Sequence, residues 1–372
     1  MTDDLLYQIA ITRISDIGIQ KAKMLISYFG SAKEVFKASK QELQDCFKNN
    51  DAAISGLLSQ KDKTLHDAEK EFAFINQHKI STYFYFDSNY PSRLYNYEDA
   101  PLLLYTTGNI NMEATHTLSV VGTRMPTDRG VELCKQIIRD IARQMPDTVI
   151  VSGLAYGIDV TAHRTAIETN LPTFIIPAHG LDRIYPYEHR EVAKRATKNG
   201  GIITEYPSGT RPEAYNFLAR NRIIAMLGDA TLVVESKIKG GSLSTARRAF
   251  EYGKTVFAIP GRTQDERSAG CNMIIKNGIA QLVENADDIL FHLRWERART
   301  KKEEVQTELF VSLPPEEEKI LNVLRTKEDG MYMNELLQLL NATYSDVSSL
   351  LILMEMKGLL KSLPGNIYRA LK

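Results

Sequence analysis

Residues 118–124 have the sequence Leu-Ser-Val-Val-Gly-Thr-Arg, a short apolar run that ends in a glycine turn, and a helix is expected to begin near Thr127 and Asp128. Further runs rich in apolar and β-branched residues alternate with helical stretches; they cover residues 149–152, 173–176, 202–204, 231–235 and 255–259. Such alternation is typical of βαβ units. We therefore expect an α/β fold with an extended Rossmann-like parallel sheet as its core and helices on both faces.

Glycine turns follow four of these runs. They are Gly122-Thr123-Arg124, residues 152–159 with Gly153 and Gly157, Gly240-Gly241-Ser242, and Pro260-Gly261-Arg262. The carboxyl ends of parallel strands share one edge of a sheet, which is where ligands bind. Glycine lets backbone N–H groups approach a ligand closely, and helix N-termini add partial positive charge. The pattern predicts a site for anions at this edge.

The sequence disfavours a dinucleotide or ATP as that anion. The first predicted strand is followed by Gly-Thr-Arg-Met-Pro, so Arg124 and Pro126 fill the space that a pyrophosphate would need, and no Gly-x-Gly-x-x-Gly motif is present. The phosphate-binding pattern Gly-x4-Gly-Lys-Ser/Thr is also absent. We expect no bound cofactor.

Candidates for catalysis are few. His163 and His179 lie near predicted strand ends, where a lone histidine is more often a hydrogen-bonded structural residue. Asp159 and Asp182 precede or open helical segments, which favours capping, and Glu205 at a strand end has a similar interpretation. We expect neither a catalytic residue nor a metal site.

Composition places limits on the partners. The 372 residues favour two or three domains, and 46 basic residues balance 46 acidic ones. Three widely spaced cysteines, an acidic start and no long apolar run favour a cytoplasmic protein without a membrane segment. The charges segregate locally: residues 236–262 contain six basic residues and one acidic residue, and residues 183–222 contain eight and four. Such stretches form either a cationic groove or solvated helix faces.

One segment is typical of a nucleic-acid contact. Residues 216–222 are Asn-Phe-Leu-Ala-Arg-Asn-Arg, so Phe217 is followed closely by Arg220 and Arg222. A base stacked on an aromatic ring gains about 1–3 kcal/mol, and arginines neutralise phosphates. The alternative is that Phe217 belongs to the core and that an arginine, above all Arg222, pairs internally with a carboxylate such as Glu205.

These motifs together resemble the DNA-processing protein A family, DprA, also called Smf. The matching motifs, in order, are residues 120–124, 152–159 with Ala162-His163, Gly180-Leu181-Asp182, Glu205-Tyr206-Pro207, residues 217–224, Gly241-Ser242-Leu243 and Gly270-Cys271-Asn272. The resemblance is dense over residues 90–290 and looser at both ends.

The resemblance implies a non-enzymatic protein that binds single-stranded DNA without sequence preference and loads the RecA recombinase during natural transformation. Combined with the segment above, the expected DNA-binding residues are Gly122, Thr123, Arg124, Phe217, Arg220, Arg222, Lys239, Gly241 and Ser242. Some family members have a basic residue just before the position of Phe217, where this chain has Asn216 and only Arg211 nearby. Family members form homodimers through the Rossmann-like domain, here assigned to residues 271–282.

The expected domain order is a helical domain over residues 1–80, the Rossmann-like domain over 83–292, a linker over 296–315 and a winged helix over 316–372. Residues 14–19 and 29–31 resemble a SAM or helix-hairpin-helix fold, for which we favour an interaction role. The predicted recognition helix, residues 344–356, contains Asp346 and Glu355 and no Arg or Lys. A helix that reads duplex DNA carries polar and basic residues, so we expect this module to pack or bind protein.

A second class of function remains open, a nucleotide-processing hydrolase of the phosphoribohydrolase type. Such enzymes also place a Gly-Gly turn before a helix, but they need a catalytic carboxylate shortly after it. In this chain Thr245 is followed by Ala246, Arg247 and Arg248, so that acid is missing.

Overall fold

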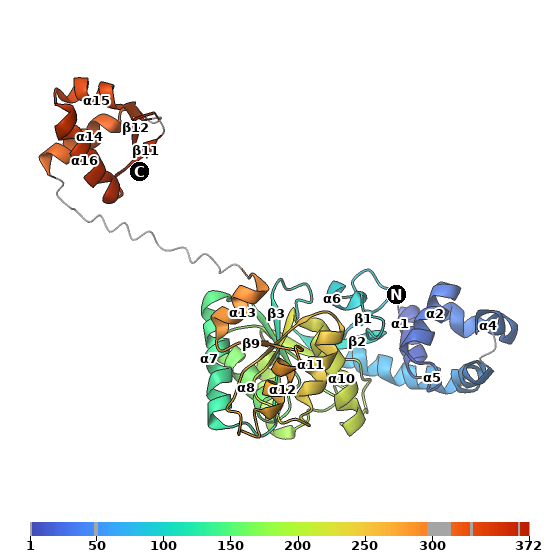
Figure 1. Cartoon of the computed structure of the whole chain (residues 1–372). Coiled ribbons are helices and arrows are strands. Elements are labelled where there is room, and N and C mark those ends of the chain that lie inside the picture. The colour runs from blue at the N-terminus through green and yellow to red at the C-terminus, as the bar shows by residue number, and fades with distance from the viewer. Residues whose placement is uncertain (1, 48–50, 296–313, 328–329, 364, 372) are drawn as a thin grey trace. The chain divides into compact units, whose positions relative to one another are not determined.

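The computed structural model describes residues 2–47, 51–295, 314–327, 330–363 and 365–371. The chain forms two compact units, residues 1–298 and 299–372 (Figure 1). The predicted fold class is confirmed: a mixed α/β core with a large parallel sheet, helices at the N-terminus and a winged helix at the C-terminus. The predicted linker lies almost wholly outside the described residues.

A nine-stranded sheet forms the centre of the first unit, in the order β1-β2-β6-β5-β4-β3-β7-β8-β9. Neighbours from β6 through to β9 are parallel, whereas β2 pairs with β1 and β6 in antiparallel fashion. The strands are β1 (Ser81–Phe84), β2 (Leu103–Gly108), β3 (Thr117–Val121), β4 (Val149–Ser152), β5 (Thr173–Ile175), β6 (Gly200–Thr204), β7 (Ala230–Val233), β8 (Thr255–Ala258) and β9 (Gln281–Leu282). The strand order reverses beside β3, which creates a topological switch point between β3 and β7.

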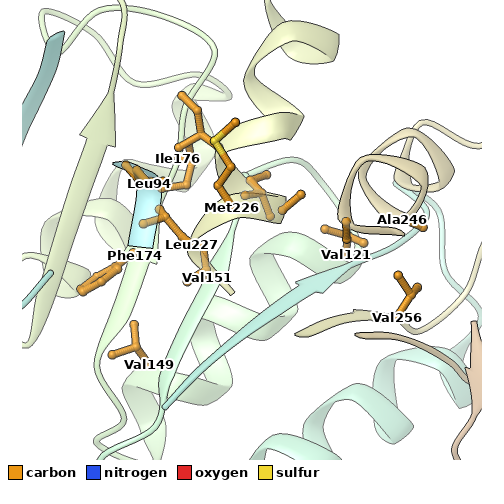
Figure 2. Close-up of a cluster of buried hydrophobic side chains, with 14 of the residues drawn as sticks. Leu94, Val121, Val149, Val151, Phe174, Ile176, Met226, Leu227, Ala246 and Val256 are labelled. Carbon is orange, nitrogen blue, oxygen red and sulfur yellow. The ribbon is translucent and has the colours of Figure 1, made fainter. Parts of the chain in front are cut away.

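Helices cover both faces of the sheet because its strands are apolar on both sides. They are α6 (Ser92–Tyr95), α7 (Asp128–Gln144), α8 (Ile158–Glu168), α9 (Arg190–Ala196), α10 (Ala214–Leu227), α11 (Ser242–Glu251), α12 (Ala269–Lys276) and α13 (Ala286–Leu293), with a short 3-10 turn at Tyr187–His189. On one face Met226 and Leu227 of α10 and Ala246 of α11 pack on Val121 and Val151 (Figure 2). A second cluster on β3, β4 and β7 packs against α7, α8 and α13.

The N-terminal helices share a core with the antiparallel edge of the sheet. They are α1 (Thr2–Thr12), α2 (Ile19–Phe29), α3 (Ala32–Lys37), α4 (Lys40–Phe47) and α5 (Asp51–His78). Their buried apolar residues form one cluster with Phe84 of β1 and with Leu103 and Tyr105 of β2. The helices are therefore held to the sheet by apolar burial as well as by the chain connection.

The second unit has a small core of its own. Its elements are α14 (Pro315–Leu324), β10 (Met331–Tyr332), α15 (Met333–Leu340), α16 (Tyr344–Met356), β11 (Leu360–Leu363) and β12 (Ile367–Ala370), with strand order β10-β12-β11. Residues such as Leu324, Leu336 and Met354 are fully buried between these elements. The helix predicted over residues 344–356 is α16.

Within the described residues, no single helix has both the length and the apolar character needed to cross a bilayer. Only α15 and α16 taken together meet that test, and they are separated by a bend of 112°.

Candidate nucleic-acid interface

A cavity of about 710 Å³ opens at the carboxyl ends of β3, β4 and β7, beside α10; we call it the strand-end pocket. It brings together eight of the nine predicted site residues, Gly122, Thr123, Arg124, Phe217, Arg220, Lys239, Gly241 and Ser242. The turns after the strands form its base, and α10 and α11 form its walls. Three of the four glycine turns expected at this sheet edge therefore contribute to one pocket.

Glycines fix the backbone at the base of the strand-end pocket. A Cβ atom on Gly122 would lie 2.5 Å from the Ile158 side chain, and one on Gly157, whose φ is +78°, would lie 2.3 Å from the Thr123 carbonyl oxygen. The Thr123 amide donates a hydrogen bond of 2.7 Å to the Glu235 carbonyl oxygen. The loops after β3, β4 and β7 are thereby locked together, and this holds the backbone that carries Arg124.

Arg124 and Phe217 form a cationic and aromatic wall. The Arg124 guanidinium carbon lies 5.4 Å from the centre of the Phe217 ring, and the Arg220 guanidinium carbon lies 5.9 Å from it. Arg124 is exposed and makes no ion pair with any residue that the structure describes, so its charge remains available to a ligand. Phe217 is half-buried at the pocket wall, which rules out the alternative that it is a core residue.

Arg220 lies in the floor of the pocket. It is 3% exposed, and its Nη1 donates to the Gly153 carbonyl oxygen at 2.9 Å. Burial lowers the pKa of Arg220 to about 10, and the charge of Asp159 opposes that shift. Burial likewise raises the pKa of Asp159, against the effect of Arg220. Arg220 thus braces the turn after β4 from below, with Asp159 as its nearby counter-charge.

Asp159 does not cap α8, contrary to the sequence-based expectation. The N-cap residue is Gly157, and the Asp159 carboxylate accepts a hydrogen bond of 3.3 Å from the Ala155 amide inside the turn. The side chain is turned inward because Gly153, which lacks a Cβ, leaves room for it beside Arg220. Asp159 therefore supports the pocket floor.

The N-terminus of α11 faces the pocket without a side-chain cap. Its N-cap is Gly241, and no acidic residue occupies its first turn, so the helix dipole favours an anion there. The Leu243 and Ser244 amides donate to the Gly240 and Gly241 carbonyl oxygens, each at 3.1 Å. The Ser242 hydroxyl donates to the Ser236 hydroxyl at 2.9 Å and is turned inward. Lys237 and Lys239 flank this turn, both exposed. Lys237 was not predicted as a site residue, although its position just after a strand end could have indicated that it lines the pocket.

The N-terminus of α7 is already occupied by a protein carboxylate. Glu235, 3% exposed, accepts hydrogen bonds from the Thr127 amide at 2.7 Å and from the Thr127 hydroxyl at 2.8 Å. A Cβ on Gly130 would lie 2.8 Å from the same carboxylate. In dinucleotide-binding folds the pyrophosphate binds at this helix end. Here the Glu235 carboxylate occupies that position, and the turn also lacks the Gly-x-Gly-x-x-Gly motif of such folds.

The fourth predicted turn belongs to a different cavity. Pro260, Gly261 and Arg262 line a separate space of about 300 Å³ together with Thr127 and Glu235. The expectation that all four turns form one site is wrong for this turn, because β8 is separated from β3 by β7 and the Glu235 loop lies between the two cavities.

Arg222 lies outside the strand-end pocket. Its two terminal nitrogens donate to the Glu205 carboxylate at 2.8 and 2.5 Å, and the residue is 8% exposed. Residues two apart on a helix point in different directions, so Arg220 and Arg222 could not share one pocket. Arg222 therefore forms the internal pair with Glu205 that the sequence offered as the alternative to a DNA contact.

The other titratable candidates are structural, and none of them lines the strand-end pocket. His163 contacts the Thr173 hydroxyl at 2.7 Å, and His179 accepts from the Tyr185 amide at 3.1 Å. Asp182 accepts from the Gly209 amide at 3.0 Å and pairs with Arg183. Among the described residues no group of three or more His, Cys, Asp or Glu side chains could hold a metal ion.

The fold and the pocket define a class of protein: an open α/β protein with a pocket lined by basic side chains at its switch point, followed by a winged-helix unit. Residues 81–294 match the family model for DNA recombination-mediator protein A, and residues 308–366 match the DprA winged helix domain. The chain belongs to this family, DprA or Smf.

Relatives of known sequence and structure agree. The chain is 31% identical to Protein Smf of Synechocystis over 77% of its own length and 72% of that protein, and 37% identical to DNA processing protein DprA of Streptococcus pneumoniae over 57% and 74%. The crystal structure of the S. pneumoniae protein superposes with a TM-score of 0.64 at 30% identity, covering 77% of this chain and 97% of that one. DNA processing protein A of Helicobacter pylori, whose structure was described for its single-stranded DNA binding mode, gives 0.53 at 30% identity, covering 59% and 98%.

Proposed function

We propose that the strand-end pocket binds single-stranded DNA without sequence preference and that the protein loads the RecA recombinase onto that DNA during natural transformation. One observation carries the proposal: the guanidinium of Arg124, which makes no ion pair among the described residues, lies over the Phe217 ring in a pocket that the N-terminus of α11 also lines. The pair of Arg124 and Phe217 suits a base with its phosphate, and the N-terminus of α11 suits the next phosphate. The binding mode described for the H. pylori relative supports the same conclusion.

The composition of the pocket favours binding to any sequence. The charges of Arg124 and Lys239 and the dipole of α11 attract phosphates, and phosphates carry no sequence information. Phe217 offers a ring face, and every base can stack on a ring. The Asn221 side-chain nitrogen donates to the Ser244 hydroxyl at 2.8 Å and to the Gly241 carbonyl oxygen at 3.5 Å, so its N–H groups are engaged within the protein.

Replacing Arg124 tests the proposal. Fluorescence anisotropy with oligonucleotides of mixed sequence is expected to show that Arg124→Ala weakens binding to all of them to a similar degree. The slope of log affinity against log salt is expected to fall by about 0.7, the value for one phosphate contact on a single strand. Arg262→Ala is the matched control, because Arg262 follows a glycine turn at the same sheet edge but lines the other cavity. Equal losses for the two variants, or a loss confined to one sequence, would contradict the proposed site.

RecA loading needs its own measurement. RecA-dependent ATP hydrolysis on single strands already coated with single-strand-binding protein is expected to rise when the wild-type protein is added. The Arg124→Ala variant is expected to give little increase. Full stimulation by that variant would separate RecA loading from the strand-end pocket.

We further infer a cytoplasmic homodimer that joins through residues 271–282. This segment comprises most of α12 and the edge strand β9, where Leu282 is 47% exposed beside unpaired backbone groups. Light scattering is expected to show a dimer for the wild type and a monomer for Leu282→Lys.

The hydrolase alternative has less support. Helix α11 carries exposed Arg247 and Arg248 where a catalytic carboxylate would be needed, and Asp159, the acid in the pocket lining, is 7% exposed and engaged by the Ala155 amide. We propose that the protein has no hydrolytic activity. Release of free base from a panel of nucleoside monophosphates would revive this alternative.

A further inference from the structure

A second cavity, of about 390 Å³, lies on the other flank of α10; we call it the α10-flank cavity. The end of β6, helices α10 and α11 and the start of α2 contribute to it, and the lining residues used below are Asp99, Glu205, Tyr206, Tyr215, Leu218 and Arg248. Leu218 lines both this cavity and the strand-end pocket, and its side chain is 58% exposed. The two spaces are therefore neighbours across a single ridge of one helix.

The walls of the α10-flank cavity include two tyrosine rings. Tyr215 is 78% exposed and makes no hydrogen bond or ring contact within the described part of the chain. Tyr206 is half-buried and fixed, because its hydroxyl donates to the Asn216 carbonyl oxygen at 3.1 Å. One ring is thus held in place, and the other is free to cover a flat ligand.

The floor of this cavity holds two carboxylates and one guanidinium, so it offers no spare positive charge. Glu205 is paired with Arg222, whose Nε also lies 3.9 Å from Asp99. The Tyr252 hydroxyl donates to the Asp99 carboxylate at 2.6 Å. The floor therefore suits an uncharged planar group with polar edges, rather than a phosphate.

One cation lies at the rim. The side chain of Arg248 is 53% exposed, and its partner Glu251, at 3.3 Å and three residues away on the same helix, is 59% exposed. Exposed pairs of this kind contribute little and are readily exchanged for another anion. The cavity thus combines an aromatic interior that lacks a spare cation with a cation at its rim, which matches a nucleotide with the base inside and the phosphate outside.

We propose that the α10-flank cavity is a second nucleobase site for the same strand that occupies the strand-end pocket. The DNA crosses α10 over Leu218, a base stacks on Tyr215, and the adjoining phosphate contacts Arg248. This inference rests on the proposed function and extends it, because the protein then grips the strand at two places separated by the width of a helix, about 10–12 Å.

A length series of oligo(dT), extended one nucleotide at a time and measured by anisotropy with the full-length chain, tests the proposal. Wild-type affinity is expected to rise at the length that first reaches the second cavity. Tyr215→Ala is expected to leave shorter oligonucleotides unaffected and to weaken longer ones about 5- to 150-fold, the range for loss of one stacked base. Tyr215→Phe is expected to restore the wild-type value, because the ring and not the hydroxyl makes the contact. Arg248→Ala is expected to lower the salt slope by about 0.7 on longer oligonucleotides only.

Tyr28→Ala is the matched control, since Tyr28 on α2 is 60% exposed and lines neither cavity. The proposal is overturned if Tyr215→Ala weakens all lengths equally, weakens none, or is not rescued by phenylalanine. If the wild type binds no oligonucleotide at any length, the proposed function itself fails, and that result is distinct from any effect of Tyr215.

Discussion

Arg222 was predicted from the sequence to contact DNA, but in the structure it forms a buried ion pair with Glu205. The Arg222 side chain is 10% exposed and that of Glu205 is 14% exposed, and two hydrogen bonds join them. Charges removed from water in this way must be matched, since an uncompensated buried charge is costly. The spacing of residues 216–222 predicted that both arginines contact DNA, but it could not show which helix face would be buried against a carboxylate.

We expect Arg222→Met to destabilise the protein by about 3–5 kcal/mol, because Glu205 would lose its counter-charge. Urea unfolding followed by circular dichroism measures the loss. The double variant Arg222→Met/Glu205→Leu is expected to recover most of it, because an apolar pair of similar volume can replace a buried ion pair. A single variant as stable as the wild type would show that the pair is dispensable.

His163 links stability to pH. Burial, assisted by the charges of Arg220 and His189, lowers the pKa of His163 from its usual 6.5 to about 3. Between those values the unfolded chain binds a proton that the folded chain does not, so stability is expected to fall as pH falls from about 6.5 towards 3. The slope from this group is at most about 1.4 kcal/mol per pH unit. His163→Asn, which has no titrating group, is expected to unfold with a shallower pH dependence in urea titrations at pH 6.5 and 4.5; an unchanged slope would contradict this assignment.

At the scale of elements, the strands and their glycine turns were predictable because hydrophobic alternation and glycine placement are local signals. The predicted run 149–152 is β4 itself, and the run 231–235 is β7 shifted by one or two residues. The separation of the fourth turn was not predictable, because it depends on strand order and on the Glu235 side chain. The loop before α10 likewise depends on contacts far away in the sequence.

Helix α5 holds that loop through Glu71. The Glu71 carboxylate is 2% exposed, accepts from the Ser208 amide at 3.0 Å and from the Ser208 hydroxyl at 2.5 Å, and pairs with Arg13 at 3.0 Å. The next amide, that of Gly209, donates to Asp182. These two carboxylates fix the turn that leads to Pro212 and α10, both of which line the strand-end pocket.

We expect Glu71→Ala to weaken binding to single-stranded DNA and to speed hydrogen exchange at the Ser208 and Gly209 amides, because the turn loses its acceptor. Glu69→Ala, an exposed glutamate of the same helix, is the control and is expected to change neither. Faster exchange with unchanged affinity would mean that this turn does not set the shape of the pocket.

At the scale of the whole molecule, each of the two units has its own core, and the candidate DNA site lies in the first. We expect a protein of residues 1–298 to bind oligonucleotides as tightly as the full chain. A shorter protein of residues 83–292 is expected to be less stable and to aggregate, because Leu103 and Tyr105 lose the helices that cover them. Gel shifts and thermal unfolding compare the three proteins; a full-length chain that binds much more tightly than residues 1–298 would give the winged helix a direct part in binding.

The carboxylate of Glu235 at the start of α7 has a further consequence. Dinucleotide-binding proteins of this architecture hold the pyrophosphate at the corresponding helix end. Because a carboxylate of the chain already occupies that position, NADH is expected not to bind at α7, and a changing cellular NADH pool is expected not to act on the proposed DNA site through this helix.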